Sequence, residues 1–159
     1  MSYIADKIIK NPKAIITTHT SQQTSSSSAN TAIILSGSEI TYTPDISASK
    51  VVYEIMFYSE IINNNGFISL ELQHYVSNTW SEINARFNKN MGLAGGSQNM
   101  RYCNTYRYVL PTWTGARQLR IAMASHDDNR VIKFHKLTNW DGSTATDQFC
   151  NTNLLVYSI

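Results

Sequence analysis

The chain has 159 residues, enough for one domain with its own hydrophobic core and no need of disulfides or metal. Its formal net charge is only +2, and its Lys and Arg residues are scattered singly, which argues against nucleic acid as a partner. No window approaches the roughly 20 apolar residues that span a bilayer, and the N-terminus lacks the apolar region of a cleaved signal peptide. We therefore expect neither a membrane span nor classical secretion.

The first residues predict a short arm of uncertain local structure. Ile4 and Ile8 have helical spacing, and Pro12 would end a helix after one or two turns. A helix this short is marginal in water unless it packs against a partner or its own domain. The alternative is an extended strand, because residues 14–18 (AIITT) favour β-structure.

A polar tract follows at residues 20–30 (TSQQTSSSSAN). It has almost no apolar area to bury, so it predicts a flexible linker or a long surface loop. We place the start of the compact domain near Thr31. The expected organisation is an arm and linker over residues 1–30 and a single domain over residues 31–159.

From Thr31 onward the apolar pattern has a period of two. Residues 51–58 (VVYEIMFY) are apolar on both faces, which predicts a central strand, whereas residues 68–73 and 119–124 alternate with one buried face. Turn signals recur at short intervals, and Asn65-Gly66 is the strongest hairpin signal among them. No stretch has a sustained helical pattern. We therefore predict an all-β, two-sheet antiparallel sandwich of the jelly-roll type.

The last residues form two short apolar runs, 131–137 and 154–159, separated by a polar loop. A chain end frays unless it is held, and a loose LLVYSI segment would expose a large apolar surface. We predict that this segment is a strand buried inside a sheet or at a subunit contact. The candidate interface residues here are Leu154, Leu155, Tyr157 and Ile159.

An aromatic stretch lies at residues 101–113 (RYCNTYRYVLPTW). In a regular strand, Tyr102, Tyr106 and Tyr108 would share one face, and Cys103, Arg107 and Val109 would share the other. If exposed, the tyrosine face would suit a sugar or a protein partner. We favour core or subunit interface over an exposed glycan site, because sandwiches commonly fill their interior with such residues.

Two tryptophans are further candidates for receptor contact. Trp113 follows the tyrosine stretch, and Trp140 begins a Trp140-Asp141-Gly142 turn signature. Either Trp140 covers the edge of the core or its loop projects toward a receptor. The sequence leaves both alternatives open.

No motif predicts an enzyme, a cofactor or a metal site. The four histidines have no ligand spacing, and His126 beside Asp127 and Asp128 is explained by a solvated turn. There is no G-x-S-x-G motif, and the glycines at 92–96 lack the Lys-Ser/Thr of a phosphate loop. No two glutamates have a spacing that marks a hydrolase pair.

The two cysteines, Cys103 and Cys150, lie far apart in the sequence. No CxxC or Cys/His spacing surrounds them. The favoured interpretation is two small buried thiols, and the alternative is one disulfide between them.

Several sequence blocks resemble a known family. They are Gln118-Leu119-Arg120-Ile121, Val131-Ile132-Lys133-Phe134-His135, Trp140-Asp141-Gly142, Asp147-Gln148-Phe149, residues 154–159 and Lys50-Val51-Val52-Tyr53-Glu54. Together they resemble the C-terminal domains of fibre-like virion proteins from marine bacteriophages and large algal viruses. The resemblance covers residues 47–159. Ser, Thr and Asn make up 48 of the 159 residues, a composition that recurs in extracellular and virion β-proteins.

The resemblance implies a jelly roll similar to the C1q and tumour necrosis factor heads, assembled as a trimer on the virus surface. In such trimers the terminal strand lies in the inner sheet near the threefold axis, which would bury residues 154–159. Fibres usually carry this domain after a long repetitive shaft, which is lacking here. A capsid- or tail-attached spike, fibre tip, decoration or minor capsid protein is therefore the expected form.

The leading hypothesis is a non-enzymatic structural protein of the virion surface, a homotrimer located on the capsid or tail. Its arm would dock on another virion protein, and its loops would be available to a host glycan or receptor. The alternative is a carbohydrate-binding, lectin-like module in which aromatic side chains stack on a sugar. The candidate platform residues are Tyr102, Tyr106, Trp113 and Trp140.

Overall fold

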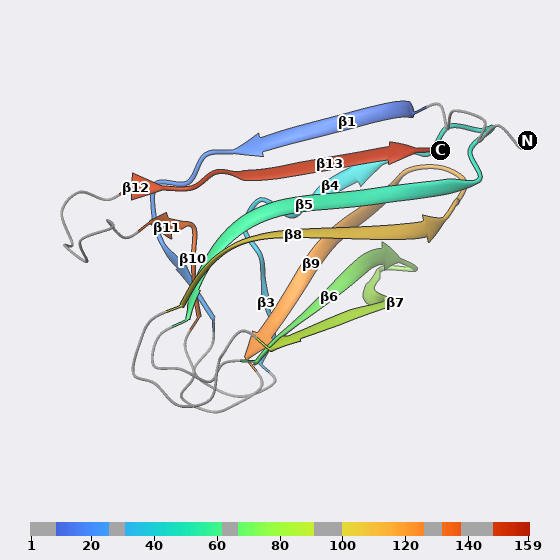
Figure 1. The fold of residues 1–159 in the computed structure, drawn as a ribbon. Coiled ribbons are helices and arrows are strands. Elements are labelled where there is room, and N and C mark those ends of the chain that lie inside the picture. The colour runs from blue at the N-terminus through green and yellow to red at the C-terminus, as the bar shows by residue number, and fades with distance from the viewer. Residues whose placement is uncertain (1–8, 26–30, 62–66, 91–99, 126–131, 138–147) are drawn as a thin grey trace, which may run out of the picture.

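The computed structural model describes residues 9–25, 31–61, 67–90, 100–125, 132–137 and 148–159 (Figure 1). Every regular element in these residues is a β-strand, which confirms the all-β prediction. Within the same residues there is no helix of the length and hydrophobicity that would cross a membrane.

The strands of the first half of the chain are β1 (Lys10–Thr17), β2 (Gln23–Thr24), β3 (Ile33–Ile34), β4 (Ile40–Tyr42), β5 (Lys50–Ile61), β6 (Phe67–Val76) and β7 (Thr79–Asn90). Those of the second half are β8 (Met100–Pro111), β9 (Arg117–Ser125), β10 (Ile132–Phe134), β11 (Lys136–Leu137), β12 (Gln148–Phe149) and β13 (Thr152–Ser158).

The strands form two main antiparallel sheets, which lie one above the other in Figure 1. Sheet A has the order β1-β13-β5-β10-β2, and β8 pairs with the other edge of β5. Sheet B has the order β3-β9-β6-β7, and β4 also pairs with β9. Strands β11 and β12 form a separate two-stranded ribbon.

The pairing is nested from the ends of the chain inward. The first strand pairs with the last (β1 with β13), β3 and β4 pair with β9, β5 pairs with β8, and β6 pairs with β7. Two further pairs, β13 with β5 and β9 with β6, join these ladders into the two sheets. This arrangement is the jelly roll, so the predicted fold is confirmed.

Strand β5 is the centre of sheet A, as its two apolar faces predicted. One edge pairs with β8 along all 12 residues, and the other pairs with β13 and then with β10. Its inward side chains meet those of sheet B in one core. The fully buried large side chains of this core are Tyr42, Tyr53, Phe57, Phe134, Leu35, Ile55, Leu70, Leu72 and Leu119.

The C-terminal strand is held along its whole length, which confirms the prediction for residues 154–159. Strand β13 lies between β1 and β5, so both of its backbone edges are paired. Even the final residue is held: the Ile159 N–H donates to the Lys50 carbonyl at 3.0 Å, and the Ile159 carbonyl accepts from the backbone N–H groups of Ser49 and Lys50.

The predicted boundary at residue 30 needs correction for residues 10–25. These residues were expected to belong to an arm and linker, but they contain β1 and β2, which are strands of sheet A. The β-favouring residues 14–18 had left an extended strand open as an alternative here. As an edge strand with mostly exposed side chains, β1 lacks the clear apolar alternation that would have placed it inside the domain. Residues 1–8 and 26–30, on which the rest of the arm prediction falls, lie outside the described residues.

Candidate functional site

The tyrosines of β8 face the core. Tyr106 is 8% exposed and Tyr108 is 3% exposed, and Tyr102 is half-buried against the same cluster. Tyr106 stacks on Phe57 with ring centroids 5.7 Å apart. This placement agrees with the core alternative and leaves Tyr106 and Tyr108 unsuited to contact a glycan or receptor directly.

The opposite face of β8 is exposed, and it carries the residues that the alternation had grouped together. Cys103, Arg107 and Val109 all lie on this outer side. The expectation of two buried thiols is therefore wrong for Cys103, which is exposed, while Cys150 is half-buried; both are free. Burial, followed by the nearby Cys103, raises the pKa of Cys150.

Trp113 packs partly into the core at the end of β8. Its ring meets Tyr42 edge-on with centroids 6.3 Å apart, and the Arg117 guanidinium lies 4.8 Å from the ring centroid. The indole Nε1 is buried without a partner among the described groups. A pocket of about 360 Å³ opens beside the ring, between the loops at residues 43–48 and 112–115. Trp113 lines this pocket, but its N–H group is buried and is not accessible to a ligand there. Trp140 lies outside the described residues.

The C-terminal candidates divide between the two faces of β13. Leu154 is 1% exposed and belongs to the core. Leu155 and Tyr157 have the opposite parity and lie on the outer face, where Leu155 is half-exposed and Tyr157 is 7% exposed. Ile159 is half-exposed beyond the end of the strand.

The outer face of sheet A carries an unusual number of apolar side chains. Outer faces of antiparallel sheets are normally polar. Here the pairing places apolar residues from four adjacent strands on one surface. We call this surface the sheet A face, and its apolar members are Ala14, Ile16, Val52, Met56, Val109, Leu155 and Tyr157, of which Val52 and Tyr157 are buried in the single chain.

Charged and hydroxyl groups interrupt the sheet A face at one place. Arg107 Nε lies 3.7 Å from the Glu54 carboxylate, and Arg107 also donates to the Tyr157 hydroxyl at 3.0 Å. These contacts run across β13, β5 and β8, so they fix the Tyr157 ring over the sheet. The face is therefore apolar at its rims and has a small polar group near its middle.

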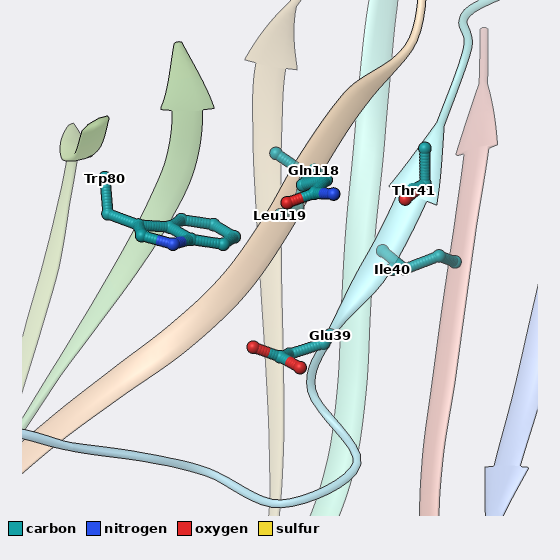
Figure 2. A pocket seen from close by; sticks show the side chains of 6 residues that line it. All are labelled: Glu39, Ile40, Thr41, Trp80, Gln118 and Leu119. Atoms are coloured by element: carbon teal, nitrogen blue, oxygen red, sulfur yellow. The ribbon is translucent and has the colours of Figure 1, made fainter. Parts of the chain in front are cut away.

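The outer face of sheet B is different, because it carries a row of aromatic and polar side chains. Trp80 on β7 is opposite Tyr75 on β6, Tyr75 is opposite Gln118 on β9, and Gln118 is opposite Thr41 on β4. The two rings are 5.3 Å apart. A pocket of about 210 Å³ lies at this row, lined by Glu39, Ile40, Thr41, Trp80, Gln118 and Leu119 (Figure 2). We call it the Trp80 pocket.

Sequence reasoning did not single out Trp80. A signal was present, since Ser77-Asn78 reads as a turn between two β-favouring runs. Both residues have positive φ, 52° and 62°, as a tight primed hairpin turn requires. Such a turn pairs Val76 with Thr79, which makes Tyr75 the partner of Trp80.

A buried polar cluster joins the two terminal strands of the domain. The His19 and His135 rings stack with centroids 3.6 Å apart and an angle of 8° between their planes. His19 Nε2 lies 2.8 Å from the Thr152 hydroxyl, and His135 Nδ1 lies 3.4 Å from the same oxygen. Gly37 packs at this junction with φ 83°, and a Cβ there would lie 2.8 Å from the Cβ of Thr152.

Burial favours the neutral form of both rings in this cluster. The Ser36 N–H donates to Gln23 Oε1 at 2.9 Å, so this oxygen is an acceptor toward His135 Nε2, 3.4 Å away. The Thr152 hydroxyl donates to the Ser36 carbonyl at 3.4 Å and lies within hydrogen-bond distance of both rings. Burial first, and then the neighbouring His19, lowers the pKa of His135 to about 4, and burial also lowers the pKa of His19.

Within the described residues, no group of three or more His, Cys, Asp or Glu side chains is placed to hold a metal ion. His126, Asp127 and Asp128 lie outside these residues, as do the glycines at 92–96.

Comparisons with known proteins leave the family open. No protein-family model matches the chain, and no curated protein matches it. Among solved structures, the chain is weakly similar to "Structure of infectious bursal disease virus Gt strain", with 14% sequence identity and a TM-score of 0.26. The match covers 99% of this chain and 40% of the other, so this chain spans well under half the length of that viral chain. A likeness this weak carries no argument about function.

Proposed function

We propose that this protein is a non-enzymatic structural component of a virion surface, and that it forms a homotrimer through the sheet A face. The observation that carries the proposal is the exposure of apolar groups on this face: Ile16 is 68% exposed and Val109 is 57% exposed. Exposed apolar side chains that gather on one face of a protein commonly mark sites of association. The resemblance of residues 47–159 to fibre-like virion domains supplies the virion location and the threefold symmetry.

The position of the sheet A face suits contact between identical copies. Ile16 and Val109 lie on β1 and β8, at opposite edges of the same face, so the two neighbours of each copy in a ring of three would share the width of four strands. The Glu54–Arg107 pair carries both signs of charge, so copies related by a rotation axis could exchange these contacts without like-charge repulsion. An obligate interface of this kind buries more than about 2,000 Å² in total.

The remaining partners follow from this arrangement. With the sheet A face turned inward, the connections at the ends of the sandwich would stay available to a host receptor. Residues ahead of β1 would make the contact with another virion protein, on the capsid or on the tail.

Native mass spectrometry tests the assembly. Wild-type protein should give three times the 17.9 kDa mass of one chain. Val109→Lys combined with Ile16→Lys should give a folded monomer, because both side chains are exposed in the single chain and the two ammonium groups would have to be buried on association. Val76→Lys is the matched control, since Val76 is also exposed but lies at the β6–β7 turn of sheet B. A wild-type monomer, or a double variant that stays trimeric, would contradict the proposal.

A further inference from the structure

The outer face of sheet B has the features of a small-ligand site. Opposite residues on adjacent antiparallel strands point to the same side of the sheet. The row Trp80, Tyr75, Gln118 and Thr41 therefore presents two aromatic rings, one amide and one hydroxyl along one line across β7, β6, β9 and β4. Figure 2 shows the Trp80 ring lying across β6 toward Gln118, with the Glu39 carboxylate extending toward the same space.

The Trp80 ring is held in place by its neighbours. The Arg120 guanidinium stacks on it 3.8 Å from the ring centroid, and the Arg120 side chain is only 20% exposed. Arg120 Nε in turn donates to Gln73 Oε1 at 3.0 Å, which ties the guanidinium to β6. A ring fixed in this way loses little conformational entropy when a ligand packs against it.

The polar groups around the ring include both donors and acceptors. The side chains of Gln118 and Thr41 are exposed and have no hydrogen-bond partner within the part of the chain that the structure describes. An amide and a hydroxyl each donate and accept, and the Glu39 carboxylate, 63% exposed, adds an acceptor. Such a set suits a ligand covered with hydroxyl groups, because each hydroxyl also donates and accepts.

We infer that the Trp80 pocket binds a neutral pyranose sugar, either at the end of a glycan or within its chain. The aliphatic C–H face of a pyranose can lie on an aromatic ring, whose face carries partial negative charge, while its hydroxyls bond to Gln118, Thr41 and Glu39. A volume of about 210 Å³ is below the range of drug-sized sites, which suits a single sugar ring.

The charges at the pocket favour a neutral sugar over an acidic one. The cation stacked on the Trp80 ring is Arg120, and its guanidinium lies 3.9 Å from the Glu39 carboxylate, so the positive charge of Arg120 is already countered. The free carboxylate oxygen of Glu39 would repel a sugar carboxylate or sulfate. This inference does not depend on the assembly proposal, because the pocket lies on the opposite sheet from the sheet A face.

The test uses the intact protein on an array of neutral and acidic glycans, followed by calorimetric titration of the best neutral ligand. We expect a dissociation constant of about 1 mM for a monovalent sugar. Gln118→Ala and Thr41→Val should each weaken binding about tenfold, because each removes hydrogen bonds made only to the ligand. Trp80→Leu should abolish binding. The matched control is Thr112→Val, an exposed threonine beside Trp113, which should leave binding unchanged.

Three results would overturn the inference. They are the absence of any neutral-glycan binding by wild-type protein, binding confined to acidic glycans, and binding that Gln118→Ala and Thr41→Val leave unchanged. The two polar variants change exposed side chains, so they remain informative even if Trp80→Leu fails to fold. Because the mass of the oligomer is measured separately, failure here leaves the assembly proposal standing.

Discussion

The first and last strands of the domain lie side by side in sheet A, yet they have very different sequences. Strand β13 pairs on both edges and buries Leu154 and Val156 in the core. Strand β1 pairs only with β13, and of its eight residues only Lys10, Ile15 and Thr17 are even partly buried. A strand's position in the sheet, and not its pairing alone, therefore decides how apolar it has to be.

The sequence of β1 is that of a protected edge. Pro12 lacks the N–H that a further strand would need, and Lys10 and Lys13 add charge. Asn11 has a φ of 46°, and the register shifts between Lys10 and Lys13, so a bulge twists this end of the strand. These features keep another sheet from adding to the edge, and they also disguise the strand in the sequence.

The largest contrast should come from removing each strand. Deleting residues 152–159 takes away one partner strand of β5 and two fully buried apolar side chains, Leu154 and Val156, each worth about 1.5 to 3 kcal/mol, so no soluble folded protein is expected. Deleting residues 1–17 should leave a folded but less stable protein that aggregates through the uncovered edge of β13. Circular dichroism and size-exclusion chromatography of both truncations make the comparison. If both deletions abolish the soluble folded protein, or if neither does, the distinction between a core strand and an edge strand is refuted.

A pair of alanine substitutions narrows the contrast to one position on each strand. Ile15 and Leu154 are direct partners in the β1–β13 ladder and both point toward the core. Leu154→Ala should cost about 3 kcal/mol of unfolding free energy, because Leu154 is 1% exposed. Ile15→Ala should cost about 1 kcal/mol, because Ile15 is only half-buried. Urea denaturation measures both, and an Ile15 effect as large as that of Leu154 would show that β1 is as deeply packed as β13.

Acidification should weaken the junction between the same two strands. The pKa of His135 is about 4 in the folded protein and about 6.5 in an unfolded chain, so folding favours the neutral ring. The contribution of the neutral His135 ring to the free energy of unfolding is complete above pH 6.5 and is lost as the pH falls toward 4. The loss amounts to about 1 to 2 kcal/mol between pH 7 and pH 5.

The variant His135→Asn tests this origin of the pH dependence. His135 has a φ of 70°, a conformation that asparagine adopts more readily than most residues. Its neutral amide should flatten the stability profile between pH 5 and pH 7 in urea titrations. His74→Gln is the comparison. Burial, with a further effect of Arg117, also lowers the pKa of His74, but this residue is only half-buried on sheet B, so its replacement should flatten the profile less than His135→Asn does. If His135→Asn leaves the pH dependence of the unfolding free energy unchanged, the acid sensitivity comes from another group.

Several elements of the fold were predictable because their signals are local. The two-faced apolar run of β5, the alternation of β6 and β9, and the apolar end of β13 each predicted the observed strand. The parity of β8 correctly separated Tyr106 and Tyr108 from Arg107 and Val109. The parity alone did not say which face was buried, because that depends on which side of sheet A faces sheet B.

The candidate surfaces were less predictable. The Trp80 pocket requires β4, β9, β6 and β7 to be adjacent, and Thr41 and Gln118 are far apart in the sequence. The sheet A face likewise joins Ile16 near one end of the chain to Leu155 near the other. Neither grouping has a motif of its own, since each member reads locally as an ordinary strand residue.

By itself, the order of residues determined the class of fold, the central strands and the burial of the C-terminal end. These features follow from the alternation and the apolar content of short segments, which can be recognised within a few residues of the sequence. Tertiary structure decided that β1 belongs to the domain, that the tyrosines of β8 face inward, and that aromatic and polar groups meet on the outside of sheet B. Those features depend on which strands become neighbours. In a jelly roll, strands from opposite ends of the chain pair with each other, and a pattern within one short segment cannot predict such a pairing.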